Sequence, residues 1–340
     1  MAKTVDVLGV PHTYELTTPT HQTCLVFVHG WLLSRTYWRP LIRHLQNHAC
    51  LVYDLRGFGE SCVALSPLEG TAEDQGRAEA ELSPQIIGTK SEATAPIAIE
   101  CRSASTTPSV HPLVVSPYSP AAYAQDLNRL LEALDIKAAW VIGHSLGGSI
   151  GLWAALQSPE RIRGCICVNS GGGIYLKEEF EKFRNAGKQL VRLRPHWLKK
   201  LPLLDLLMAR MNVARPIARQ WGRQRIFDLV AAQPEAALGA LLESTTEEEV
   251  HRLPHVVSHL PQPVYFIAGE ADDIMEPKYV DHLASFHRLF RDKGQNVIKL
   301  PQCGHFAMIE QPERLAEEIK AILARHQYGQ ADIDGELADA

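Results

Sequence analysis

Ser145 stands in the segment VIGHSLGG, with Gly143 two residues before it and Gly147 two residues after it. An apolar run precedes this G-x-S-x-G pattern, and a helix-like segment, LGGSIGLWAAL, follows it. In that context the pattern is typical of a nucleophile elbow, a sharp strand-to-helix turn where only small neighbours avoid a clash. We therefore interpret Ser145 as a nucleophile with an exposed hydroxyl; the alternative is a glycine-rich turn of purely structural use.

A nucleophilic serine needs a base to take its proton, and the base needs a carboxylate to orient it. Among the 15 histidines, His305 is placed best, because it follows a strand-like run and precedes a helix in NVIKLPQCGHFAMIEQ. The segment VYFIAGEADDIMEP offers Asp272 and Asp273 after another strand-like run. The chain order Ser, Asp, His is the one that this turn architecture uses. The residues alone leave the choice between the two aspartates open.

Several apolar runs end in Gly, Asp, Ser or His, and most of them precede a segment of helical periodicity. Near-continuous apolar runs that alternate with helices predict an α/β fold, a mostly parallel central sheet with helices on both faces. Ligands of such sheets bind outside the carboxyl ends of the strands, so the residues that end these runs are the first functional candidates. The runs are CLVFVHG, CLVYDLRG, AWVIGHS, CICVNSG, VYFIAGE and NVIKLPQCGH.

Two segments interrupt the alternation of strands and helices. Residues 63–117 are rich in Ser, Thr, Pro, Ala and Glu without a sustained period, which predicts a flexible insertion within the core. Residues 174–258 show several short helical patterns divided by prolines, which predicts a helical cap inserted before the last strands. We expect residues 1–173 and 259–327 to form the core. Residues 328–340 are expected to be a disordered acidic tail.

Composition and charge exclude several classes of protein. With 46% hydrophobic and 21% charged residues, the chain resembles a globular enzyme. Its net charge of −5 and the lack of zinc-type Cys/His spacing argue against a nucleic-acid partner and a metal site. No apolar stretch reaches the roughly 18 residues of a membrane span, and the start of the chain does not resemble a signal peptide. Seven scattered cysteines suit a reducing compartment, so we expect a cytoplasmic protein without a transmembrane segment.

The predicted cap combines positive charge with an apolar stripe. Trp197, Leu201, Leu204, Met208 and Met211 follow helical spacing beside many Lys and Arg residues. We expect the stripe to pack over the catalytic pocket, with Trp197, Leu204 and Met208 in contact with a hydrophobic substrate. Two alternatives stay open: the basic amphipathic segment lies on an anionic membrane surface, or its charges line a pocket for an acidic substrate.

The segments VHGWLLS, YDLRGFGES, GHSLGG and the pair GEADDIMEP with GHF resemble, in this order, the motifs of the α/β-hydrolase superfamily, in its branch of serine esterases and haloperoxidase-like hydrolases. The resemblance covers nearly everything outside the insertion and the tail. It implies that the backbone N–H groups of Trp31 and Leu146 form an oxyanion hole. The family's usual G-x-x-D spacing selects Asp272 over Asp273. Ser145 argues against the superfamily members that use an aspartate nucleophile.

The expected activity is serine-dependent hydrolysis of a carboxylic ester, with an apolar acyl or alcohol part, through an acyl-enzyme intermediate. Such a reaction needs no metal and no organic cofactor. The alternatives within the same Ser-Asp-His triad are hydrolysis of a carbon–carbon bond, acyl transfer and elimination by a lyase. A noncatalytic ligand-binding receptor on the same fold is the contrasting alternative, because fold does not fix function.

Overall fold

Apolar strands build an eight-stranded sheet in the computed structural model, which describes residues 2–17, 23–62, 116–172, 177–293 and 296–336. The strand order is β1-β2-β4-β3-β5-β6-β7-β8. β1 and β2 pair antiparallel at one edge, and the pairs from β4 to β8 are parallel. The strands are β1 (Lys3–Val7), β2 (Val10–Leu16), β3 (Cys24–Val28), β4 (Cys50–Tyr53), β5 (Ala139–His144), β6 (Ile162–Val168), β7 (Val264–Gly269) and β8 (Val297–Leu300).

Helices cover both faces of this sheet. Along the sequence, a group of helices lies between β6 and β7, which are neighbours in the sheet. The predicted α/β fold class is therefore confirmed. The helices are η1 (Arg35–Trp38), α1 (Arg39–Ile42), α2 (Pro120–Ala133), α3 (Leu146–Gln157), α4 (Lys177–Arg192), η2 (His196–Lys200), α5 (Leu204–Met208), α6 (Arg219–Ala231), α7 (Pro234–Ser244), α8 (Glu247–His259), α9 (Pro277–Ala284), α10 (Arg288–Lys293), α11 (Ala307–Glu310) and α12 (Pro312–Glu336).

Alternate residues of the strands pack into two hydrophobic cores. In β3, Val26 belongs to the core on one face, together with Leu127 of α2 and Ile150 of α3. Its neighbour Phe27 belongs to the core on the other face, together with Ile319 of α12. Successive side chains of a strand point to opposite faces. A strand that is apolar throughout is therefore stable only between two layers of helices, as β3 is here.

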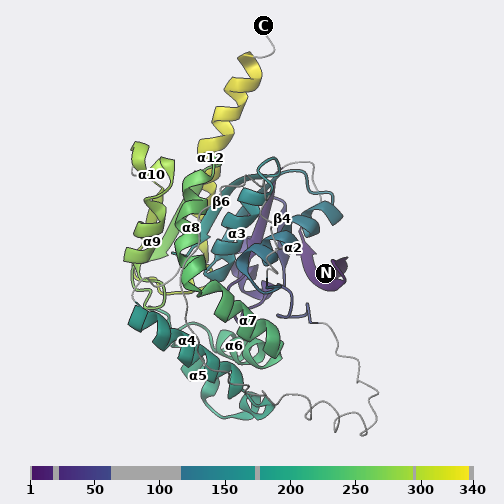
Figure 1. Cartoon of the computed structure of the whole chain (residues 1–340), viewed down its shortest axis with the longest axis vertical. Helices are drawn as coiled ribbons and strands as arrows, with labels where there is room; N and C mark the ends of the chain where they lie inside the picture. Colours follow the sequence, from purple (N-terminus) through teal and green to yellow (C-terminus); the bar gives the residue numbers. More distant parts are fainter. Residues whose placement is uncertain (1, 18–22, 63–115, 173–176, 294–295, 337–340) are drawn as a thin grey trace, which may run out of the picture. The chain divides into compact units, whose positions relative to one another are not determined.

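The segment predicted as a cap is helical, but its last helix packs with the core. α8 lies against α3 and α9, and its residues Leu253 and Val257 are fully buried in the same core as Ile150 (Figure 1). α4 packs against α7, and α6 packs against η2 and α5. We therefore propose that the cap consists of residues 177–244.

The predicted insertion and tail are only partly described. Residues 63–115 of the expected insertion and residues 337–340 of the expected tail lie outside the described residues. Residues 328–336 of the expected tail continue the last helix, α12. None of the described helices is long and apolar enough to cross a membrane.

A buried ion pair joins the loops that follow β3 and β4. The guanidinium of Arg35 bonds the carboxylate of Asp54, which also accepts the N–H of Arg35 at 2.7 Å and that of Glu60 at 2.9 Å. Both members of the pair are buried, while the Glu60 side chain, which bonds the same guanidinium at 2.8 Å, is 67% exposed. The backbone of both loops therefore depends on Asp54.

Asp54→Ala is expected to lower the free energy of unfolding by about 3–5 kcal/mol, because it leaves the buried Arg35 charge without its main partner. The matched control is Glu60→Gln, which keeps a polar side chain at an exposed partner of the same guanidinium and should cost less than about 1 kcal/mol. Urea unfolding of both variants measures the difference. Equal losses would show that Asp54 is not the anchor of these loops.

Candidate active site

Ser145 occupies the turn between β5 and α3. Its backbone has φ 52° and ψ −119°, a conformation that costs a residue with a side chain about 1–3 kcal/mol. A Cβ on Gly143 would lie 2.1 Å from the carbonyl oxygen of Gly147, and a Cβ on Gly147 would lie 2.2 Å from that of Val28. Both positions therefore require glycine, and the turn at Ser145 is possible only because both have it.

The loop after β3 lies against Ser145. A Cβ on Gly30 would lie 3.1 Å from the Cβ of Ser145, so the next residue, Trp31, begins close to the serine. Leu146 is the first residue of α3, where backbone N–H groups have no acceptor within the helix. Within the described residues, the N–H groups of Trp31 and Leu146 have no hydrogen-bond partner. Neither N–H group is therefore occupied by an acceptor from the described part of the chain.

His305 is held by Asp272, which follows β7. The Nδ1 atom of His305 lies 2.8 Å from Oδ2 of Asp272. Asn169 also donates to this oxygen at 2.8 Å, while the other carboxylate oxygen accepts the N–H groups of Ile274 and Met275 at 2.9 Å each. Burial alone would raise the pKa of Asp272, but His305 and these hydrogen bonds outweigh it and hold the pKa below its usual value. The carboxylate is therefore charged when it meets the imidazole.

The structure separates the two aspartates that the sequence left open. Asp272 is buried against His305, whereas Asp273 is exposed and lies 3.5 Å from the side-chain nitrogen of Asn212. His305, which contacts Asp272, also lies close to the serine turn. Its ring centroid is 4.8 Å from that of His144, the residue before Ser145. Asp272 and His305 are thus brought together beside the residue that precedes Ser145, and Asp273 is not.

Two further polar residues position the pair formed by His305 and Asp272. Asn169, at the end of β6, donates to Asp272 and also to the carbonyl of Gly304 at 3.1 Å. His144 bonds the carbonyl of His305 through Nε2 at 2.7 Å. Burial and the neighbouring His305 lower its pKa to about 3, so it stays neutral. The signal that could have found Asn169 is its position at the end of the run CICVNS.

The segment between α5 and α6 reaches the backbone of His305. The carbonyl of Asn212 accepts the His305 N–H at 2.9 Å. Arg225 of α6 is buried; its guanidinium donates to the carbonyl of Met211 at 2.8 Å and to the Asn212 side chain at 3.3 Å. The same guanidinium lies 4.5 Å over the ring of Phe306. Asn212 therefore holds the backbone of His305, and Arg225 in turn holds Asn212. No sequence pattern indicated either residue.

Glu310 of α11 ties the same loop down from the other side. Its carboxylate accepts the N–H groups of Gly304 at 3.0 Å and Phe306 at 3.1 Å, on either side of His305. It also accepts the N–H of Ala214, in the segment between α5 and α6, at 2.8 Å. Hydrogen bonds to a carboxylate are stronger than those between neutral groups, so the loop is fixed where core and cap meet.

A cavity of about 80 Å³ opens beside Ser145. Apolar side chains of the core, Leu146 and Met275, and of the cap, Phe183 and Leu241, line it. The indole of Trp31 also borders it and donates to a carbonyl of α7 at 2.7 Å. The cap therefore contributes α4 and α7 to the surroundings of the serine.

Trp197, Leu204 and Met208, predicted to contact the substrate, lie outside the cavity beside the serine. None of these three described side chains lines the cavity beside the serine, and Trp197 is 58% exposed. The prediction assumed a continuous helix, whereas Leu203 adopts φ 65° between the short helices η2 and α5. Helical spacing does not carry across such a break, so the stripe cannot present one face to the pocket.

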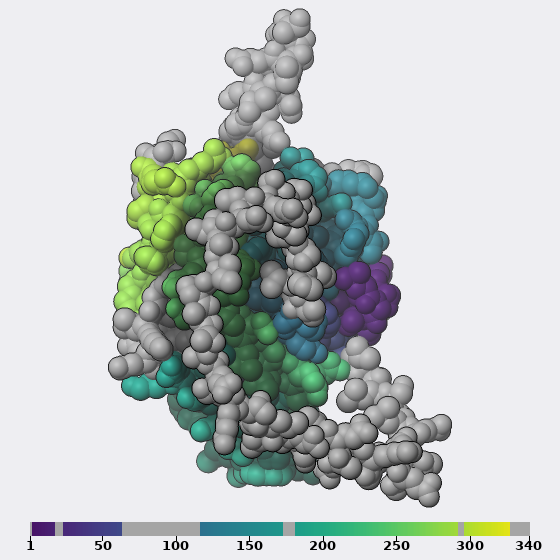
Figure 2. All heavy atoms as spheres, in the orientation of Figure 1, coloured from purple at the N-terminus to yellow at the C-terminus, as the bar shows by residue number. Residues whose placement is uncertain are grey.

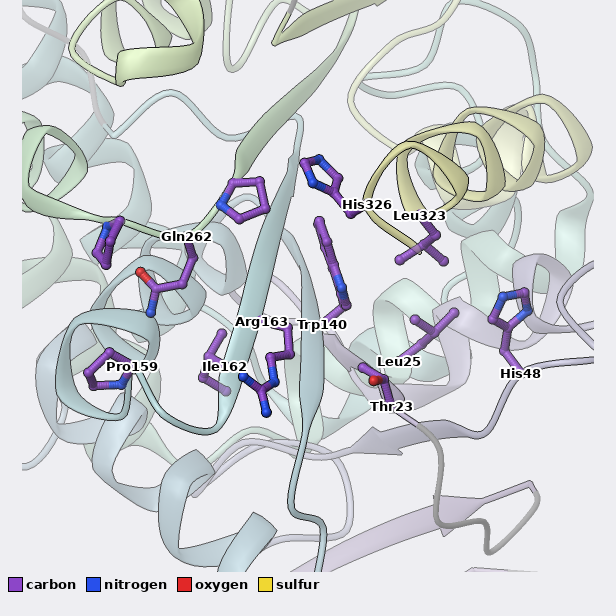
Figure 3. Close-up of a pocket in the computed structure, with 12 residues that line it drawn as sticks. Thr23, Leu25, His48, Trp140, Pro159, Ile162, Arg163, Gln262, Leu323 and His326 are labelled. Atoms are coloured by element: carbon purple, nitrogen blue, oxygen red, sulfur yellow. The ribbon is translucent and has the colours of Figure 1, made fainter. Parts of the chain in front are cut away.

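A second cavity, of about 350 Å³, lies at the amino ends of β5 and β6, away from the carboxyl end of β5, which Ser145 follows (Figure 3). Trp140 and Ile162, at or next to the first residues of β5 and β6, border it together with His326 of α12. His326 bonds the hydroxyl of Tyr265 at 3.0 Å. Because ligands of parallel sheets bind at the carboxyl ends of the strands, this cavity is not the candidate active site.

The comparisons with known proteins identify the family of the fold. A family model described as alpha/beta hydrolase fold matches residues 23–312. The chain is 29% identical over 195 residues to an uncharacterized hydrolase, YugF, of Bacillus subtilis, covering 56% of this chain and 67% of that protein. It is 41% identical over 61 residues to a putative carbamate hydrolase, RutD, of Caulobacter segnis, covering 18% of this chain and 23% of that protein.

Solved structures resemble the whole fold at low identity. An esterase from Thermogutta terrifontis matches with a TM-score of 0.64 at 19% identity, covering 96% of this chain and 98% of that chain. An enol-lactonase from Burkholderia xenovorans matches with a TM-score of 0.62 at 17% identity, covering 95% and 100%. At such identities the likeness shows the fold alone. Because the family model spans most of the sequence, and the sheet and the serine turn have the expected form, the chain belongs to the α/β-hydrolase family.

Proposed function

We propose that the protein is a serine hydrolase that cleaves carboxylic esters through an acyl-enzyme intermediate. The observation that carries the proposal is the buried contact of His305 with Asp272, 2.8 Å long, at the sheet edge where Ser145 occupies its strained turn. A neutral imidazole that donates through Nδ1 has Nε2 free to accept a proton. Ser145, His305 and Asp272 would thus supply the nucleophile, the base and the orienting acid that acyl transfer requires.

The first half of the reaction forms the acyl-enzyme. The Ser145 oxygen attacks the ester carbonyl carbon while Nε2 of His305 takes the hydroxyl proton. The carbonyl oxygen becomes an anion and accepts hydrogen bonds from the N–H groups of Trp31 and Leu146. The charge of Asp272 stabilises the imidazolium. When the tetrahedral species collapses, the bond to the alcohol breaks and His305 returns the proton to the leaving alkoxide.

The second half of the reaction uses water in place of the serine. His305 removes a proton from water, whose oxygen attacks the acyl carbon. The same two N–H groups bind the new oxyanion. Collapse breaks the bond to Ser145, the serine oxygen regains a proton from the imidazolium, and the carboxylic acid leaves.

The cavity suggests a hydrophobic acyl group of limited size. Its volume of about 80 Å³ and its borders of Leu146, Phe183, Leu241 and Met275 favour an apolar group and set a limit to its length. This part of the proposal replaces the contact with Trp197, Leu204 and Met208 by contact with α4 and α7.

Ser145→Ala is expected to abolish ester hydrolysis and labelling by a fluorophosphonate, because the attacking oxygen is gone. Ser145→Gly should be equally inactive but more stable than Ser145→Ala by about 1 kcal/mol, since glycine adopts positive φ without strain. Initial rates with a p-nitrophenyl ester and urea unfolding give the two readouts. A variant within tenfold of the parent rate would exclude Ser145 as the nucleophile, and labelling that persists without hydrolysis would point to another serine.

Asp272→Asn should reduce kcat by about 10⁴, because an amide in place of the carboxylate selects the wrong histidine tautomer. The matched control is Asp273→Asn, which changes the same residue type one position later at an exposed site and should leave kcat within a few-fold of the parent. Steady-state kinetics of the two variants decide the assignment. The opposite ranking would transfer the role to Asp273.

Phe183→Ala is expected to shift the acyl preference toward longer chains, because it removes a wall of the cavity. The ratio of kcat/KM for hexanoate over acetate esters should rise several-fold, since each extra buried methylene contributes up to about 0.8 kcal/mol. Leu204→Ala is the control, a cap leucine outside the cavity, and should leave that ratio unchanged. A shift in Leu204→Ala alone would restore the α5 contact as the determinant.

A further inference from the structure

One part of the cap exposes an unusual number of apolar side chains. Ten large hydrophobic residues are exposed in the described part of the chain, and eight of them fall between residues 190 and 227. Single exposed apolar residues are ordinary, but a cluster of this size marks a surface that contacts something apolar. We call it the cap surface; its apolar members are Leu190, Leu193, Trp197, Leu201, Leu203, Leu207, Met211 and Phe227.

The same segment is strongly basic. Between residues 190 and 227 the sequence holds nine Lys or Arg residues and a single acid, Asp205, although the whole chain has a net charge of −5. Two of the nine are internal: Arg225 is buried, and Arg194 donates to the carbonyl of Leu229 at 2.6 Å. The seven exposed cations are Arg192, Lys199, Lys200, Arg210, Arg215, Arg219 and Arg223.

Cationic and apolar groups alternate at short range on this surface. A groove of about 550 Å³ runs between η2, α5 and α6, and Leu203 and Phe227 border it beside Lys199. The ammonium of Lys199 lies 4.4 Å over the Phe227 ring. The only acid, Asp205, is occupied by Arg219 at 2.6 Å and by a second arginine at 3.0 Å. The surface thus presents apolar side chains within a positive field.

The charge and the apolar side chains of the cap surface together indicate which kind of partner it binds. A purely apolar patch would fit another protein, whereas seven exposed cations around the apolar groups match the anionic headgroups that cover the acyl region of a bilayer. The apolar side chains come from α4, η2, α5 and α6 and from the segments that connect them. Three of them, Leu201, Leu203 and Phe227, border the same groove. Figure 2 shows the teal surface of this part of the chain at the lower end of the view.

We propose that the cap surface docks the protein on anionic lipid bilayers, with its apolar side chains among the acyl chains and its cations on the headgroups. This mode of attachment lies in the interface and does not require a spanning helix. The proposal does not depend on the proposed function, because it is tested by binding and not by turnover.

The experiment is co-sedimentation of the full chain with vesicles of equal parts phosphatidylcholine and phosphatidylserine, and with phosphatidylcholine alone. We expect binding to the mixed vesicles to be at least about tenfold tighter, and to weaken at high salt because the headgroup attraction is screened. Equal binding to both vesicles, or to neither, would overturn the proposal.

The apolar contribution is tested with Leu203→Asn and Leu207→Ser in one chain. Asparagine tolerates the positive φ of position 203, so the turn is kept. The matched control carries Leu8→Asn, at another positive φ, and Leu156→Ser; within the described residues these are the two large hydrophobic side chains that are exposed outside the cap surface. We expect the first variant to lose most of the binding and the second to retain it, with unchanged unfolding midpoints. Equal binding by both variants would contradict the proposal that these apolar side chains insert among the acyl chains.

The charge contribution is tested with Lys199→Glu and Lys200→Glu, against Lys3→Glu and Lys137→Glu as a control of equal net charge at exposed sites elsewhere. Only the first pair should abolish binding to the mixed vesicles. Equal losses would show a general charge effect and contradict a localised surface. Sedimentation velocity without lipid adds a last arm: a dimer that dissociates in the apolar variant would assign the surface to a second copy of the chain.

Discussion

The strained turn at Ser145 requires glycine two residues before it and two residues after it, because the surrounding backbone leaves no room for side chains there. The carbonyl of Val28 in β3 crowds Gly147, and Gly147 in turn crowds Gly143. The N–H of Ser145 bonds the carbonyl of Val168 in β6 at 3.0 Å, so strands on both sides of β5 hold the strained residue. The strained conformation of the serine therefore depends on the pairing of the central strands in this register. The loop with Trp31 follows β3 directly, and its distance from the serine depends on the same pairing.

The histidine loop is positioned in another way, by side chains from distant parts of the chain. Asp272 holds the ring, while His144 and Asn212 bond the backbone of His305. Glu310 bonds the residues on either side of it. Each of these contacts joins a separate element to one loop. The serine is thus placed by the pairing of strands and the histidine by a set of polar contacts, which explains why one is strained and the other is not.

Much of this arrangement could be predicted from the sequence, because its signals are local. Strands buried on both faces are continuous apolar runs, and the turn at Ser145 needs glycines at fixed spacing. The role of Asn212 leaves no such signal, since its contact with His305 is made by a backbone carbonyl. The stripe through Leu204 does not line the cavity beside the serine, and the backbone of Leu203 interrupts the helix on which the stripe is based. No spacing rule detects a leucine at positive φ, where glycine or asparagine is the usual residue.

The carboxylate of Glu310 has a consequence for how this fold diversifies. It bonds Ala214 in the cap and two residues beside His305 in the core with one side chain. A chimera that grafts the cap of another family member onto this core would have to supply an N–H at the position of Ala214. Without it, the histidine loop would lose one of its links to the segment between α5 and α6. Exchange of the cap is therefore constrained by this hydrogen bond and by the contact of Asn212 with His305.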